Sequence, residues 1–153
     1  MAERFHAHDV AMEMASALRA TLEVLARQDR DLASQLRRAA SSVVLNLAEG
    51  ARRAGKDRLH FYRIAAGSAA ETRSGLELAG AWGYVDPTSL EPVEILLDRV
   101  LAMLWRLTHG GGLTVAVGRD GGRGQTRARG RGRGPWPSFL ALRATPETPA
   151  PPS

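Results

Sequence analysis

Positively charged side chains gather in the middle of the sequence and could bind phosphate groups. Seven of them lie between residues 37 and 63, a span that contains only Glu49 and Asp57 as carboxylates. A cation that neutralises a phosphate releases counterions, so such a set gives nucleic-acid affinity that falls steeply with salt. The alternative is an ordinary charged helix surface, with intrachain pairs such as Asp57 with Arg58. The seven residues are Arg37, Arg38, Arg52, Arg53, Lys56, Arg58 and Arg63.

A second basic set lies near the C-terminus, where Arg127, Arg129, Arg131 and Arg133 alternate with alanine and glycine. Arginine-glycine segments bind RNA electrostatically and without sequence preference. The alternative is that the segment is incidental, because the chain has 20 Arg and one Lys, as GC-rich coding would give. The sequence leaves both interpretations open.

Signals for catalysis are few. His6, His8 and Asp9 could ligate a metal, but no second ligand cluster with a recognised spacing follows them. The sequence contains no phosphate-binding glycine loop, nucleophile elbow or Glu-x-x-His pair. We therefore expect a protein that is not an enzyme and that has no metal site and no cofactor.

A third set of residues suggests contacts between subunits. Leu45 falls on the face opposite the apolar stripe of its helix, beside Ser41, and Gly67 interrupts a helix where it costs roughly 1 kcal/mol relative to alanine. A glycine there predicts the close approach of another backbone, from the same bundle or from a neighbouring subunit. Asn46 and Glu49 could contact a neighbouring subunit or could satisfy the end of their own helix. The predicted oligomer interface is therefore Leu45, Ser41, Asn46, Glu49 and Gly67.

Four helices must position these groups, over about residues 10–27, 32–53, 57–82 and 90–108. The second helix carries an apolar stripe at four-three spacing, and the fourth repeats apolar residues from Val93 to Leu107 in the same way. We expect residues 1–8 to be frayed, Asp9 and Asp31 to cap the first two helices, and Gly83 to end the third. Short connections predict an all-α, up-down-up-down antiparallel four-helix bundle. The third helix is expected to turn inward Phe61, Ala65, Ser68, Ala69, Thr72, Leu76 and Ala79.

Charge divides the 153 residues into two parts. Residues 1–109 carry 14 basic and 14 acidic side chains, whereas residues 110–153 carry 7 Arg against Asp120 and Glu147. We therefore expect a bundle over 1–109 and a disordered Gly/Arg/Pro-rich tail over 110–153. The chain has no cysteine, and its N-terminus and apolar runs fit neither a signal peptide nor a membrane span. These features predict a cytoplasmic protein.

Three motifs resemble a known family. They are Gln35-Leu36-Arg37-Arg38-Ala39-Ala40, the segment 46–50, and Gly67-Ser68 with Glu71. Together, over about residues 8 to 108, they resemble the four-helix-bundle proteins encoded in intervening sequences of large-subunit ribosomal RNA genes. That family is related to the accessory variability determinant bundles of diversity-generating retroelements.

The resemblance implies a homopentamer of bundles that acts as a non-catalytic nucleic-acid-binding accessory or scaffold. RNA is favoured over DNA as the ligand. The alternative is a protein-interaction module that docks a partner such as a reverse transcriptase, which would itself make most of the nucleic-acid contacts.

Overall fold

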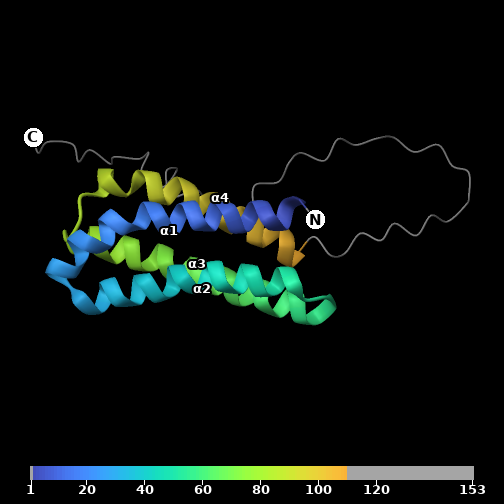
Figure 1. Cartoon of the computed structure of the whole chain (residues 1–153). Coiled ribbons are helices and arrows are strands. Elements are labelled where there is room, and N and C mark those ends of the chain that lie inside the picture. The colour runs from blue at the N-terminus through green and yellow to red at the C-terminus, as the bar shows by residue number, and fades with distance from the viewer. Residues whose placement is uncertain (1, 110–153) are drawn as a thin grey trace, which may run out of the picture.

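The computed structural model describes the backbone of residues 2–109 and the side chains of residues 6–109. Over this range the chain forms four α-helices and one 3-10 turn. Figure 1 shows the four helices as a long antiparallel bundle, in which each helix packs against its neighbour in sequence and α1 also packs against α4. The all-α up-down-up-down prediction is confirmed. The elements are α1 (Ala2–Gln28), α2 (Arg30–Arg52), α3 (Gly55–Ala81), η1 (Pro87–Leu90) and α4 (Glu91–His109).

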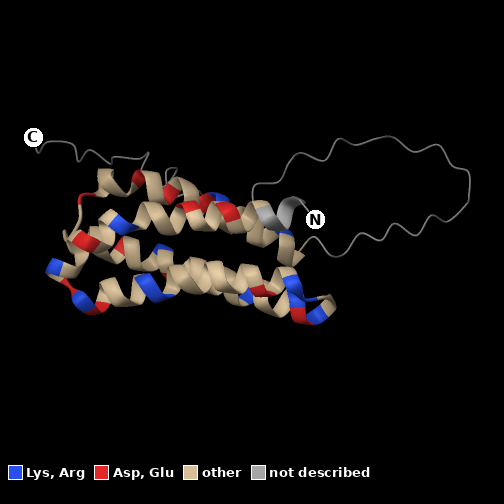
Figure 2. Cartoon of the chain, in the orientation of Figure 1, with Lys and Arg blue, Asp and Glu red and all other residues tan. Residues whose placement is uncertain are grey.

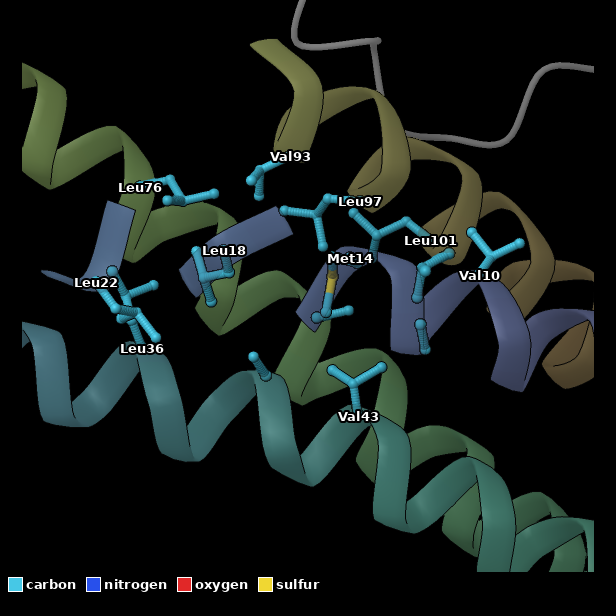
Figure 3. Close-up of a cluster of buried hydrophobic side chains, with 14 of the residues drawn as sticks. Val10, Met14, Leu18, Leu22, Leu36, Val43, Leu76, Val93, Leu97 and Leu101 are labelled. Carbon is cyan, nitrogen blue, oxygen red and sulfur yellow. The ribbon is translucent and has the colours of Figure 1, made fainter. Parts of the chain in front are cut away.

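One apolar core runs along the inside of all four helices. Val10, Met14 and Leu18 of α1 meet Val43 of α2 and Leu97 of α4, as Figure 3 shows. Burial of aliphatic side chains of this size stabilises a fold by about 1.5–3 kcal/mol each. The stripe expected for α2 is confirmed, since each of its members is at most 7% exposed: Leu32, Leu36, Ala39, Ala40, Val43 and Leu47.

The first helix begins earlier than the sequence predicted. Residues 2–8 are helical, and Asp9 lies inside α1 with a 71% exposed side chain, so its expected role as an N-cap is wrong. Ala7 is fully buried one turn before Val10 and Ala11. The apolar stripe therefore extends N-terminal of Asp9 to Ala7, which belongs to the core of the bundle.

The cap of α2 is Asp29 and not Asp31. The Oδ1 atom of Asp29 accepts a hydrogen bond from the backbone N–H of Leu32 at 2.9 Å. Asp29 is also the one residue between α1 and α2, and its own N–H donates to the carbonyl of Leu25 at 2.7 Å. Asp31 lies in the first turn of α2, where a carboxylate interacts with the helix dipole without capping.

The end of α3 and the start of α4 each lie within one residue of their predicted positions. Gly83 has a φ of 71°, the left-handed conformation expected after a helix end. The chain then forms η1, where Asp86 accepts from the N–H of Thr88 at 2.8 Å. Asp86 is thus the N-cap of η1, and α4 starts one residue later than expected, at Glu91.

None of the helices in residues 2–109 combines the length and the apolar character needed to cross a bilayer.

Candidate nucleic-acid interface

Five of the seven predicted cations lie at one end of the bundle, where α2 ends and α3 begins. Gly55, with a φ of 56°, turns the chain between the two helices, and Figure 2 shows positively charged segments gathered there. Four of these cations have exposed side chains, Arg53 among them at 51%, and the side chain of Arg58 is half-buried. We call this group the basic end; it consists of Arg52, Arg53, Lys56, Arg58 and Arg63.

Two members of the basic end have partners within the chain. The Nε of Arg53 donates to Glu49 at 2.6 Å, and its guanidinium lies 5.7 Å from the ring centroid of Phe61. The Nε of Arg58 donates to the backbone carbonyl of Arg53 at 2.8 Å. These contacts fix the two arginines against the turn, and Glu49 offsets one of the positive charges.

The other three, Arg52, Lys56 and Arg63, are exposed and form no ion pair within residues 2–109. An exposed cation that forms no ion pair remains available to a phosphate, and contacts of this kind supply most of the affinity of non-specific nucleic-acid binding. The exposed and unpaired positive charge of the basic end therefore resides on these three side chains, and half-buried Arg58 adds a fourth charge that has no carboxylate partner among the described residues.

Arg37 and Arg38 are also exposed, but they lie elsewhere on the bundle. Arg38 precedes Arg52 by 14 residues, or about 21 Å along α2. The sequence placed all seven cations in one set, whereas the fold divides them into the basic end and a separate pair near the middle of α2. Figure 2 shows a stretch of α2 and α3 between them that is largely without charge.

The uncharged stretch contains the predicted interface residue Leu45, which is 66% exposed. The hydroxyl groups of Ser42 and Ser68 lie 2.8 Å apart and join α2 to α3 at this level. Leu45 is almost one turn after Ser42, and Ile64 is one turn before Ser68, so in antiparallel helices both lie on the same side of that contact. Ile64 is 38% exposed. The sequence did not predict it as an interface residue, because its exposure depends on how α3 packs in the bundle.

Asn46 and Glu49 make contacts inside the chain. The Nδ2 of Asn46 donates to the carbonyl of Ser42 at 2.8 Å and to its hydroxyl at 3.0 Å, so Asn46 extends the Ser42–Ser68 contact. Glu49 pairs with Arg53. Both residues therefore make contacts within their own helix and its C-cap, which is the alternative to a subunit interface that the sequence left open. A contact of either residue with a neighbouring subunit stays a prediction.

Gly50 and Gly75 pack closely against side chains of other helices, whereas Gly67 does not. A Cβ at Gly67 would meet no heavy atom within 4 Å, so no other element of residues 2–109 approaches it closely. A Cβ at Gly50 would lie 2.5 Å from Cε1 of Tyr62, whose ring is 2% exposed. Tyr62 also replaces Phe61 as the inward aromatic of α3, while Phe61 is half-buried under Arg53.

The residues that could ligate a metal by type, His6, His8 and Asp9, all lie on α1. His8 lies 3.8 Å from Asp9 on α1, and no group of three or more His, Asp or Glu side chains that could hold a metal gathers within residues 2–109. The tail set Arg127, Arg129, Arg131 and Arg133 lies outside the described residues.

Comparison with known proteins agrees with this architecture. A family model described as 23S rRNA-intervening sequence protein matches residues 4–106. The chain belongs to that family. A crystal structure from Bacteroides thetaiotaomicron VPI-5482, of a protein with unknown function from the S23 ribosomal protein family, superposes with a TM-score of 0.63 at 20% identity. The match covers 67% of this chain and 98% of the other, and at this identity it concerns the fold alone. No curated protein matches the chain.

Proposed function

We propose that this member of the family is a non-catalytic RNA-binding accessory protein that contacts phosphates through its basic end. The observation that supports the proposal most directly is the exposure of Arg52, Lys56 and Arg63 at one end of the bundle, without ion pairs in residues 2–109. The family's connection with 23S rRNA intervening sequences makes RNA the ligand to test first.

The mechanism is electrostatic and does not require base reading. Phosphate contacts position a nucleic acid on a protein without carrying sequence information. Three free cations give weak binding, but a homo-oligomer would repeat them in every subunit, and joined weak sites gain avidity without any new type of contact. Assembly and RNA binding are thus two parts of one proposal.

Charge reversal at the basic end tests the RNA contact. In the full chain, the triple variant Arg52→Glu, Lys56→Glu and Arg63→Glu should weaken binding of a fully paired RNA hairpin at least tenfold near 0.1 M salt. It should also reduce the slope of log affinity against log salt by roughly 2 to 3, because about three counterion-releasing contacts are lost. Fluorescence anisotropy at several salt concentrations measures both quantities.

The matched control reverses three exposed arginines outside the basic end, Arg19 on α1 and Arg27 and Arg30 beside the opposite turn. This control changes the net charge by the same amount, so an equal loss of affinity would show that overall charge and not the basic end governs binding. A separate variant with Arg127, Arg129, Arg131 and Arg133 changed to Gln measures the contribution of the tail. The proposal fails if the hairpin does not bind, or if only the tail variant loses binding.

We further propose that the exposed face around Leu45 and Ile64 packs against another copy of the chain, and that the oligomer is a pentamer. Leu45→Glu should convert the oligomer to a smaller species at micromolar concentration, because a buried unpaired carboxylate opposes association. The control is Val24→Glu, which places the same charge on an aliphatic position of α1 that is 46% exposed. Light scattering coupled to size exclusion gives the masses, and a monomeric unmodified protein would contradict the proposal.

A further inference from the structure

A pocket with a volume of about 350 Å³ lies between α3 and α4, outside the contacts described so far. Ala66, Gly67 and Ala70 form its α3 wall, and Leu101 and Trp105 form its α4 wall. Because no atom lies within 4 Å of the place where a Cβ of Gly67 would be, the pocket reaches the helix backbone at that point. Its volume lies within the ~300–1,000 Å³ typical of small-molecule sites.

An aromatic pair stands at one side of the pocket. The rings of Trp105 and His109 are stacked, with centroids 5.1 Å apart and planes inclined by 16°. Nδ1 of His109 lies 3.0 Å from the carbonyl of Trp105 and 2.9 Å from the hydroxyl of Thr108, which itself donates to the carbonyl of Leu104 at 2.8 Å. These bonds hold the imidazole against the indole, so the aromatic surface is ordered before any ligand arrives.

The pocket also has a cation, and that cation belongs to the basic end. Arg63 lines the pocket, is exposed, and lies eight residues, or about 12 Å along α3, from Gly55 at the turn. α4 finishes at this same end of the bundle, as Figure 1 shows. A ligand in the pocket is thus close to the surface on which we place RNA phosphates.

An apolar slot bounded by small residues on one side and aromatic rings on the other suits a flat ring, and a guanidinium at its edge suits an anion. A nucleotide combines both groups. Proteins bind single-stranded nucleic acids by stacking bases on aromatic side chains while cations follow the backbone. We propose that this pocket takes one unstacked base of a single-stranded RNA segment, with the adjoining phosphate at Arg63. This inference rests on the proposed function and assigns it a preference for unpaired RNA.

The test compares two short single-stranded RNAs that have the same number of phosphates, one with normal bases and one with abasic positions. The full-length protein should bind the normal strand roughly fivefold or more tightly than the abasic strand. Trp105→Ala should remove that preference and leave affinity for the abasic strand unchanged. Trp82→Ala is the matched control, because Trp82 is 56% exposed at the end of α3, far from the pocket, and should leave the preference intact.

A second variant guards against misfolding of Trp105→Ala, since Trp105 is half-buried. Gly67→Leu fills the pocket from the exposed face of α3, where a side chain meets no atom within 4 Å, and should abolish the base preference with the helical content preserved. Equal binding of both RNAs by the unmodified protein would overturn the proposal. So would a Gly67→Leu variant that keeps the preference, or one that loses it while its oligomeric mass falls, because another subunit would then be the occupant.

The two proposals can fail separately. If the paired hairpin binds through the basic end while normal and abasic strands bind alike, only the pocket proposal is wrong. If neither the hairpin nor the single strands bind, both are wrong.

Discussion

Replacing Gly50 by alanine should lower the free energy of unfolding by about 2 kcal/mol, within the 1–3 kcal/mol typical of overpacked cores. The new methyl group would lie 2.5 and 2.7 Å from two ring atoms of Tyr62 and 3.3 Å from Cβ of Phe61. Tyr62 is buried between helices and its ring is not free to swing outward, so α2 and α3 would have to separate near their connecting turn. Urea denaturation followed by circular dichroism measures the change.

Gly67→Ala is the control for this prediction. It makes the same chemical change in α3, but at a position with no atom within 4 Å, and should raise the free energy of unfolding by about 0.5–1 kcal/mol through helix propensity. Both variants must be compared with the unmodified protein at one concentration, because association shifts apparent stability. Equal effects of the two substitutions would mean that Gly50 does not mark a close contact.

Breaking the ion pair between Arg73 and Asp98 should lower the stability of the bundle markedly. The pair joins α3 to α4, with side chains only 14% and 22% exposed. Removing one partner of a buried pair costs 3–5 kcal/mol because the remaining charge is left in a low dielectric, and partial exposure reduces this to about 2–3 kcal/mol for Arg73→Ala. Thermal or urea unfolding should therefore show a marked loss of stability.

The exposed pair of Arg19 with Glu23 provides the comparison. Its side chains are 84% and 60% exposed and lie one turn apart on α1. Arg19→Ala should cost no more than about 0.5 kcal/mol, since water screens exposed pairs. A double-mutant cycle over Arg73 and Asp98 isolates the coupling between the two charges. A coupling free energy of no more than about 0.5 kcal/mol would mean that this ion pair contributes little to the packing of α4 against α3.

Periodicity predicted the parts of the fold that depend on one helix at a time. The spacing from Leu32 to Leu47 identified the buried side of α2, and Gly83 identified a helix end, because both signals are local. The predicted start of α1 was wrong because the burial of Ala7 depends on tertiary packing, which the local sequence does not show. Asp29 and Asp31 are both good caps by residue type, and only the backbone conformation distinguishes them.

Contacts between helices could not be predicted from the sequence. Nothing in the local pattern pairs Arg73 with Asp98, 25 residues away, or shows that Gly50 and not Gly67 meets a ring. The same limit applies to the candidate site. The sequence identified every cation of the basic end, yet the separation of Arg37 and Arg38 from it depends on the length of α2, and the pocket depends on two helices meeting.

The even number of helices has a consequence for the residues after His109. In an antiparallel bundle each helix reverses the chain, so a fourth helix returns it to the end where α2 passes into α3. His109, after which the chain continues toward the arginines at 127 to 133, therefore lies at the end of the bundle that carries the basic end. If RNA binds the basic end as we propose, a later segment of the same chain would meet that RNA intramolecularly. Its binding would then depend on an effective concentration and not on the concentration of protein in solution. A bundle with three or five helices would attach the same extension at the opposite end.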